Sequence, residues 1–278
     1  MDPLTPSQVR AYLERIRYFG PTQPTLETLQ HIHSAHLLAV PFENLDIHRG
    51  RPIRLERDPL YQKIVVERRG GFCFELNSLL AAALTGMGYS VQLLSGRVSR
   101  ADGSFGPEFD HLALQVTLDG QAWLADVGYG DSFRQPLRLG DPDIQTQAQG
   151  RYRLLPLPDS DPETARPSRH WVVQQEQPNQ TWKPLFRLDR IPRQLAEFEP
   201  MCRFHQTSPE SMFTRLRLCT LATPQGRITL TARANGSDSF KWIETTPTGK
   251  QERTLKDEKE YYRLLSLAFG IHLDKQTK

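Results

Sequence analysis

The spacing of apolar residues along this chain changes near residue 90. Over the first ninety residues, apolar positions recur every three to four residues, and from Val91 onward they recur at about every second residue. The first spacing is typical of helices that bury one face, and the second is typical of half-buried strands. Because helices come first and strands follow, the pattern predicts an α+β protein.

Three long helices are expected in the first ninety residues. The first begins at Thr5-Pro6-Ser7, and the second begins near Thr25 and ends by Pro41. The third follows Gly70-Gly71 and is stopped by Gly86 and Gly88. Apolar residues of the third helix lie at the spacing of an amphipathic helix, and they are Leu76, Leu79, Leu80, Ala83 and Leu84.

Strands are expected over the rest of the chain. In the middle they are Val91–Val98, Leu112–Leu118, Ala122–Val127, Tyr152–Leu155, His170–Gln175 and Trp182–Leu188. The segment Pro156–Ser168 is rich in Pro, Asp and Ser, and it predicts a mobile hairpin loop. Near the end we expect strands at Leu216–Leu221, Ile228–Ala232 and Phe240–Glu244, turns at Pro224-Gln225-Gly226 and Asn235-Gly236, and a final helix over Leu255–Phe269.

The composition is that of an ordinary globular protein of 278 residues, of which 38% are hydrophobic and 24% are charged. The net charge of +3 is spread along the chain, so nucleic acid is not an expected partner, although a small anionic ligand is compatible with it. No apolar run is long enough to span a bilayer, and the N-terminal residues lack the pattern of a signal peptide. Three cysteines make neither a disulfide framework nor a CxxC zinc motif, which favours the cytoplasm.

Cys73 is the leading candidate for covalent chemistry, because it lies at the start of the third helix. Unpaired backbone N–H groups and the positive end of the helix dipole favour an anion there. We therefore expect a lowered thiol pKa and a nucleophilic role. The alternative is a small buried hydrophobe, which is the usual fate of a free cysteine.

The segment from His111 to Val127 is the clearest hairpin signal, because Asp119-Gly120 is a favoured pair for a two-residue type I′ turn. This turn pairs Leu118 with Gln121, Val116 with Trp123 and Leu114 with Ala125. His111 and Asp126 then share the face opposite the core as diagonal neighbours, with backbones roughly 7–8 Å apart. An aspartate beside an imidazole fixes its tautomer and stabilises its protonated form. The hairpin therefore predicts a His–Asp pair.

His31, His33 and His36 lie in the second expected helix and invite a metal interpretation. Only His33 and His36 have the spacing of helix neighbours, and no carboxylate or cysteine nearby completes a set of ligands. We therefore expect surface or capping histidines and no metal site.

Four segments carry a resemblance to a known family. They are Pro41-Phe42-Glu43-Asn44-Leu45, Arg69-Gly70-Gly71-Phe72-Cys73-Phe74-Glu75-Leu76-Asn77, His111-Leu112 and Asp126-Val127-Gly128-Tyr129-Gly130. In order and approximate spacing they resemble the arylamine N-acetyltransferases, and the likeness covers essentially the whole chain. The length is similar to that of the shorter, bacterial type.

The resemblance implies a fold of three parts around a core like that of the cysteine proteinases. These parts are a helical bundle over residues 1–90, a β-barrel-like domain over residues 91–195 and an α/β lid over residues 196–278. It also implies a catalytic triad of Cys73, His111 and Asp126, with a supporting ion pair between Glu43 and Arg69.

The resemblance further implies which residues contact substrates. Phe42 and Tyr129 match positions that line the acceptor-amine pocket of the family. The loop Val98–Phe109, with Gly103, Ser104 and Gly106, resembles the loop that approaches coenzyme A. One region departs from the family: Cys202 and Gln206-Thr207 stand where relatives often carry an Asn and a Ser-Thr pair. Cys202 and Cys219 have no motif around them and are interpreted as structural.

The implied reaction is ping-pong transfer of an acetyl group. Acetyl-CoA would be the co-substrate, Cys73 would carry the acetyl group, and an arylamine or arylhydrazine would accept it, with no tightly bound cofactor. The oxygen of an N-hydroxyarylamine is a further possible acceptor. A thiol hydrolase, a transglutaminase-like enzyme or an amide synthase could use the same triad, and a non-enzymatic scaffold or coenzyme A-binding module could retain the fold.

Overall fold

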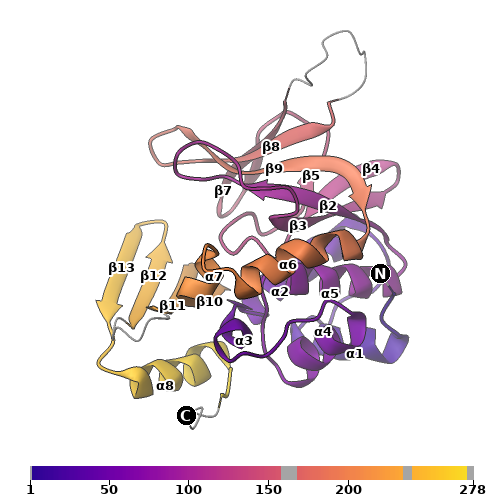
Figure 1. The fold of residues 1–278 in the computed structure, drawn as a ribbon. Coiled ribbons are helices and arrows are strands. Elements are labelled where there is room, and N and C mark those ends of the chain that lie inside the picture. The colour runs from indigo at the N-terminus through magenta and orange to yellow at the C-terminus, as the bar shows by residue number, and fades with distance from the viewer. Residues whose placement is uncertain (1, 158–167, 234–239, 274–278) are drawn as a thin grey trace.

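The computed structural model describes residues 2–157, 168–233 and 240–273, and it shows a mixed α and β protein. In Figure 1 the N-terminal helices lie below a strongly curved sheet, while a second sheet and the C-terminal helix lie to the left. Helix α6 (Glu199–Thr207) runs across the front between the helices and the curved sheet. Within the described residues, no helix is long and apolar enough to cross a membrane.

The first two expected helices form as the sequence predicts. Helix α1 (Pro6–Arg15) is capped by the Thr5 side chain, and α2 (Leu26–Ala39) is capped by Thr25. Both hydroxyls accept a backbone N–H that has no partner within the helix. Shorter helical segments that the pattern does not predict lie between α2 and the cysteine helix, and they are α3 (Leu45–His48), α4 (Arg57–Tyr61) and a π-helical turn at Gln62–Val66.

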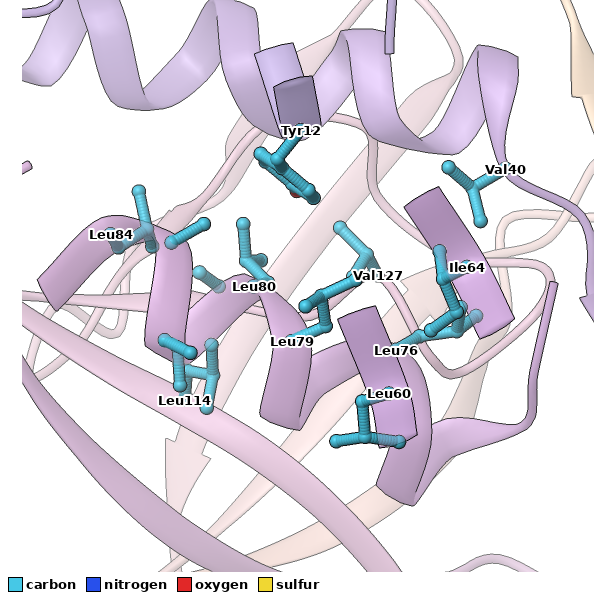
Figure 2. Close-up of a cluster of buried hydrophobic side chains, with 14 of the residues drawn as sticks. Tyr12, Val40, Leu60, Ile64, Leu76, Leu79, Leu80, Leu84, Leu114 and Val127 are labelled. Carbon is cyan, nitrogen blue, oxygen red and sulfur yellow. The ribbon is translucent and has the colours of Figure 1, made fainter. Parts of the chain in front are cut away.

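Helix α5 (Cys73–Gly86) lies at the centre of the helical part and begins at Cys73. The expected amphipathic character is wrong, because every residue from Cys73 to Leu84 is buried. Figure 2 shows the reason: side chains of α5 lie between Tyr12 of α1 and Leu114 of β3, and Val127, which follows β4, packs in the same cluster. A helix covered on all sides is held in place from all sides, and this fixes the position of its first residue.

Eight strands form the curved sheet, in the order β5-β4-β3-β2-β9-β8-β7-β6. They are β2 (Ser90–Val98), β3 (His111–Leu118), β4 (Gln121–Ala125), β5 (Leu137–Arg138), β6 (Gln145–Gln147), β7 (Gly150–Pro156), β8 (His170–Glu176) and β9 (Trp182–Arg193). The Gln145 side chain bonds the backbone N–H and C=O of Arg138 at 2.7 and 3.0 Å, so the two edge strands meet and the sheet is nearly closed.

The hairpin of β3 and β4 has the predicted register. Leu118 pairs with Gln121, Val116 with Trp123 and Leu114 with Ala125. Asp119 and Gly120 both have positive φ, +49° and +76°, as a type I′ turn requires. The ladder ends at Ala125, two residues earlier than expected, so Asp126 begins the turn that follows the strand.

A second, five-stranded sheet has the order β1-β10-β11-β12-β13. Its strands are β1 (Phe42–Glu43), β10 (Leu216–Thr223), β11 (Gly226–Arg233), β12 (Lys241–Thr246) and β13 (Gly249–Thr254), and helix α8 (Glu258–Phe269) packs against it. Strands β1, β5, β6 and β13 and helices α6 and α7 (Met212–Arg215) are not predicted from the sequence pattern. Because β1 comes from the N-terminal part, this sheet joins distant segments of the chain.

Two expectations concern segments that the structure describes in small part or not at all. Most of the loop expected at Pro156–Ser168, and the turn expected at Asn235-Gly236, lie outside the described residues. The division at residues 90 and 195 stays a prediction. The largest core cluster crosses both boundaries, because Leu114 of β3 and Phe198 pack with the N-terminal helices.

Candidate active site

Cys73 occupies the first position of α5, after the N-cap residue Phe72, and its side chain is buried. Two glycines allow the close packing around it. A Cβ on Gly70 would overlap the carbonyl oxygen of Pro41, and a Cβ on Gly128 would come within 2.7 Å of the Cys73 Cα. The Gly128 contact brings the turn after β4 directly against the start of α5.

The predicted His–Asp pair is present. His111 Nε2 lies 2.7 Å from Asp126 Oδ2, and both side chains are buried. Asp126 Oδ1 accepts hydrogen bonds from the Asn77 side chain and the Gly128 backbone, each at 2.8 Å. Burial opposes the charge of Asp126, but the His111 ring and these donors outweigh it and hold the pKa of the carboxyl below its usual value. An ionised Asp126 therefore holds the Nε2–H tautomer of His111 and leaves Nδ1 as the acceptor.

Asn77 connects the cysteine helix to this pair. It lies one helical turn after Cys73, on the same face of α5. Its amide nitrogen donates to the Leu112 carbonyl at 2.6 Å and to Asp126, and its oxygen accepts the Val127 N–H at 2.9 Å. Sequence reasoning assigned Asn77 no role, although its spacing of four residues from Cys73 was a usable signal.

Cys73 and His111 line one cavity of about 590 Å³. Phe42, Tyr129 and Val98, expected at the substrates, line the same cavity. The His111 ring is enclosed by Tyr129 and Phe186, with ring centroids 5.7 and 5.1 Å away.

The other expected coenzyme A contacts lie outside the cavity lining. Gly103 and Ser104 form an exposed turn, and Gly106 is buried behind Asp110.

The thiol does not have the electrostatics expected from its helix position. Burial raises the pKa of Cys73 well above its usual value, and the carboxylates of Asp110 and Asp126 raise it further. A hydrogen bond from the Leu112 backbone acts in the opposite direction. The prediction of a lowered thiol pKa is therefore wrong for the free protein, because desolvation exceeds the effect of the helix terminus. A thiolate here requires a proton acceptor, and His111, which lines the same cavity, is the candidate.

A layer of buried charges lies beneath the cysteine loop. Arg69 forms an ion pair with Glu43 at 2.7 Å, as expected, and a second one with Asp46 at 3.0 Å. Lys63 joins Asp46 at 2.9 Å to Glu75, in the first turn of α5, at 2.7 Å. With three carboxylates and two cations, the layer has one excess negative charge. Burial raises the pKa of Glu75 to about 7, and the charge of Glu43 adds to this effect. The pKa of Lys63 also rises, because several carboxylates lie near it.

Two of the three histidines in α2 contradict the surface or capping interpretation. His33 and His36 are fully buried, and only His31 is exposed. His33 Nε2 accepts the Asp126 backbone N–H at 3.0 Å, and Nδ1 lies 2.9 Å from the Arg134 carbonyl oxygen. Burial lowers the pKa of His33 to about 4, so the ring is neutral and supports the strand end that carries Asp126. Within the described ranges, no group of three or more potential ligands could hold a metal ion.

Comparisons with known proteins identify the family. A family model described as N-acetyltransferase matches residues 25–278. The chain is 31% identical to an arylamine N-acetyltransferase of Escherichia coli, over 95% of this chain and 88% of the relative. It is 36% identical to arylamine N-acetyltransferase 2 of Macaca mulatta, over 96% of this chain and 95% of the relative.

Solved structures show the same fold. The arylamine N-acetyltransferase of Salmonella typhimurium matches with a TM-score of 0.83 and 30% identity, over 99% of this chain and 94% of that one. The enzyme of Mycobacterium marinum in complex with CoA matches with a TM-score of 0.81 and 30% identity, over 95% and 92% of the two chains. The chain thus has the fold shared with cysteine proteases, and it belongs to the arylamine N-acetyltransferases, a family of acyltransferases.

Proposed function

We propose that this protein transfers an acetyl group from acetyl-CoA to an arylamine or arylhydrazine through a thioester on Cys73. His111 would accept and return the protons, and Asp126 would hold the His111 ring in the required tautomer. The observation that supports this most is the contact of 2.7 Å between His111 Nε2 and Asp126 Oδ2: an ionised Asp126 accepts the Nε2–H, which leaves Nδ1 as the acceptor nitrogen of a ring that lines the cavity with Cys73.

The first half-reaction loads the enzyme. His111 Nδ1 accepts the thiol proton, and the Cys73 sulfur attacks the carbonyl carbon of acetyl-CoA. The tetrahedral intermediate collapses by breaking the bond to the coenzyme A sulfur, which leaves with the proton from the imidazolium. Backbone N–H groups in the first turn of α5 are the candidate donors to the oxyanion, because a helix start leaves them without partners in the helix.

The second half-reaction returns the thiol. The amine nitrogen attacks the thioester carbon and forms a second tetrahedral intermediate, and His111 accepts a proton from that nitrogen. The intermediate then collapses by breaking its bond to the Cys73 sulfur. His111 returns its proton to Cys73, and the amide is released. The oxygen of an N-hydroxyarylamine could attack in the same way.

Each substrate has a proposed place in the cavity. We assign the acceptor ring to Phe42 and Tyr129, which line the cavity together with Cys73. We assign coenzyme A to the side of the cavity that Val98 lines and to the loop beyond it, with Gly103, Ser104 and Gly106, which lie outside the lining. The Mycobacterium marinum relative with bound CoA supports this co-substrate. Glu43 and Arg69 act from below, by holding the loop that leads to Cys73.

The test is the acyl-enzyme itself. Incubation with acetyl-CoA should place one acetyl group on Cys73, detected by peptide mass spectrometry, and an added arylamine should remove it as the N-acetyl product. Cys73→Ala should give no adduct, while Cys202→Ala, which removes another buried thiol, should retain it.

Other outcomes identify the alternatives. Loss of the adduct to water at the same rate with and without amine would indicate a thiol hydrolase, and transfer to protein amines would indicate a transglutaminase-like enzyme. Transfer of a longer acyl chain from Cys73 to an amine within that same chain, and to no other acceptor, would indicate an amide synthase. The absence of any adduct on Cys73 would indicate a non-enzymatic binding module.

A further inference from the structure

A second His–carboxylate pair lines the same cavity as Cys73. His205 of α6 has Nε2 3.1 Å from Asp110 Oδ1, and its Nδ1 lies 3.1 Å from Ser211 Oγ. All three residues border the cavity. Asp110 directly precedes His111, and the carboxylates of Asp110 and Asp126 are held by different histidines.

The hydrogen bonds of this group have one consistent direction. Ser211 Oγ accepts the Phe213 backbone N–H at 3.2 Å, so its own hydrogen can be donated to His205 Nδ1. His205 then carries its proton on Nε2 and donates it to Asp110. Its ring is also packed near Phe74 and Phe213, with centroids 6.0 and 5.2 Å away. With both nitrogens engaged, His205 positions the Asp110 carboxylate and is not a proton carrier.

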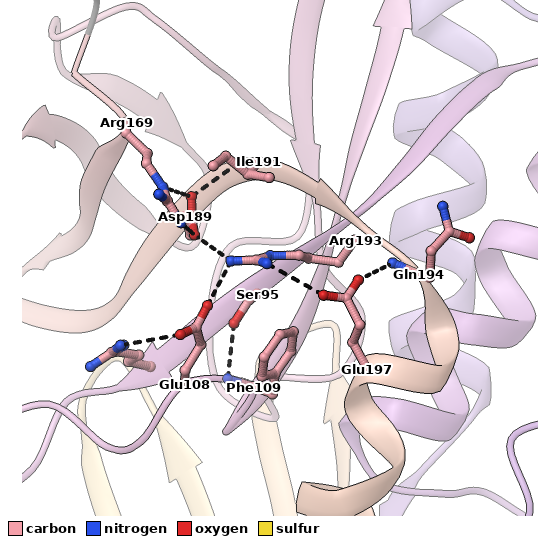
Figure 3. A network of polar contacts seen from close by, with 10 residues as sticks. Ser95, Glu108, Phe109, Arg169, Asp189, Ile191, Arg193, Gln194 and Glu197 are labelled. Atoms are coloured by element: carbon pink, nitrogen blue, oxygen red, sulfur yellow. Dashed lines mark hydrogen bonds and ion pairs between the residues drawn. The ribbon is translucent and has the colours of Figure 1, made fainter.

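Asp110 is held from the other side by an unusual turn. Phe109 has a positive φ of +64°, which is unfavourable for a residue with a side chain. Figure 3 shows how the turn is clamped: the Phe109 N–H donates to Ser95 Oγ at 2.9 Å, and Arg193 joins Glu108 to Asp189 and Glu197. The Phe109 ring lies under the Arg193 guanidinium, 5.1 Å from its centroid. Because of this turn, the Asp110 side chain points towards His205 of α6 and the His111 side chain points towards Asp126.

The Asp110 side chain borders the cavity and is 15% exposed, and its second oxygen is available as a hydrogen-bond acceptor. Within the described residues, Oδ2 accepts no hydrogen bond from the protein, and it packs against Gly106, where a Cβ would overlap it. Asp110 and Cys73 line the same cavity, and the negative charge of Asp110 adds to burial in raising the pKa of the Cys73 thiol. An acceptor molecule that attacks an acetyl group on Cys73 would bring its N–H groups to this carboxylate.

We propose that Asp110 selects the acceptor by accepting a hydrogen bond from an N–H next to the attacking nitrogen, and so favours arylhydrazines with a free inner N–H. This inference rests on the proposed acetyl transfer and assigns the selection among its acceptors to one residue. His205 and Ser211 are positioning residues for Asp110.

The test compares two hydrazines that differ in that one hydrogen. Phenylhydrazine and 1-methyl-1-phenylhydrazine share the attacking NH₂ group, but only the first has an inner N–H. The acetyl-enzyme is mixed with each, and the rate of acetyl loss from Cys73 is measured for the wild type and for Asp110→Asn. The asparagine can still accept from His205, but it presents an NH₂ donor where Oδ2 was. The preference for phenylhydrazine should fall about tenfold, the usual size of a hydrogen bond to a charged group.

The matched control is Asp119→Asn, the same substitution in the exposed turn of the same hairpin, and it should leave the preference unchanged. A general structural defect would slow both hydrazines equally and leave their ratio unchanged. An unchanged ratio in a folded Asp110→Asn variant that still transfers acetyl overturns the inference alone. If this variant does not fold, the same ratio in Ser211→Ala decides, and an unchanged value there also overturns the inference.

A second measurement does not need acetyl transfer. Alkylation of Cys73 by iodoacetamide, which is neutral, is compared with alkylation by iodoacetate, which is an anion. If the Asp110 carboxylate faces the thiol, Asp110→Asn should reduce the preference for iodoacetamide several-fold. An unchanged preference overturns the placement of the charge. If this preference shifts but the wild type forms no acetyl-enzyme, the proposed function and the acceptor role both fail, and the charge placement stands.

Discussion

Two histidines that border one cavity each hold a carboxylate, and the two pairs differ in which atom has no hydrogen-bond partner in the described residues. In the pair of His111 and Asp126, the carboxylate takes three hydrogen bonds and one imidazole nitrogen has no protein partner among the described residues. In the pair of His205 and Asp110, both imidazole nitrogens are engaged and one carboxylate oxygen has no partner within that same part of the chain. The first pair therefore presents a base, and the second presents a fixed negative charge.

This contrast shows that residue types do not determine the role of a pair. The free atom does, and it depends on which partner is saturated by its surroundings. Asp126 is enclosed by Asn77, Gly128 and His111, whereas Asp110 is held by one histidine at the cavity wall. The following predictions test that distinction, from the largest expected effect to the smallest.

Replacing Asp126 by Asn should have the largest effect. The amide would donate to His111 Nε2 and force the proton onto Nδ1, so the ring could no longer accept the thiol proton. We expect kcat/KM for an arylamine to fall by about 10⁴. Steady-state kinetics with Asp110→Asn as the matched variant would check this, because that change should cost at most about tenfold with the same arylamine. Equal losses in the two variants would remove the distinction between the pairs.

Asn77→Ala should remove the hydrogen bonds that connect helix α5 to the pair of His111 and Asp126. Three hydrogen bonds are lost, two of them to backbone groups of the hairpin, so the free energy of unfolding should fall by about 3–4 kcal/mol. Urea unfolding of the variant would measure this. Ser78→Ala is the control, because the buried Ser78 hydroxyl has no partner in the described part of the chain and its loss should be nearly neutral. An equal effect of the two substitutions would contradict the role of Asn77.

The stability of the region around the pair of His111 and Asp126 should depend on a neutral His33. The pKa of His33 falls from 6.5 to about 4 on folding, so the unfolded chain binds the proton first as pH decreases. Stability is therefore retained above pH 6.5 and is lost between pH 6.5 and 4, by about 3 kcal/mol from this residue. Urea unfolding at pH 7, 5 and 4 should show a smaller loss in His33→Gln than in the wild type. His31→Gln, at an exposed position, should behave as the wild type does.

Ser211→Ala should give the smallest effect. It removes the hydroxyl that donates to His205 Nδ1 but retains the bond between His205 and Asp110. We expect the preference for phenylhydrazine over its N-methyl derivative to fall about threefold, because the carboxylate is held less firmly. The measurement is the same ratio of deacetylation rates. A larger effect than that of Asp110→Asn would show that Ser211, and not Asp110, carries the selectivity.

The local parts of the site were predictable from the sequence. A type I′ turn and the alternation of side chains set the register of β3 and β4, and this register placed His111 beside Asp126. Capping residues and glycines likewise gave the starts of α1, α2 and α5 to within about one residue. These features depend on neighbours within a few positions, and for that reason they can be read from one sequence.

The parts that failed depend on burial. The sequence indicated a helix terminus around Cys73 but not the surroundings that raise its thiol pKa. His33 and His36 looked like surface residues, because nothing near them in sequence reveals that α2 packs on Tyr12 and on the strand end at Asp126. The pair of His205 and Asp110 spans 95 residues and uses a helix that the pattern did not predict.

By itself, the sequence determined the elements, the hairpin that joins His111 to Asp126, the start of the cysteine helix and, through its motifs, the family. Only the tertiary structure decided that Cys73 shares a cavity with His111, that Asn77 connects them and that Asp110 faces the same space. The physical reason is the range of the interactions. Turns, caps and strand alternation act over a few residues, whereas desolvation and the meeting of charges depend on segments that only the packed core brings together.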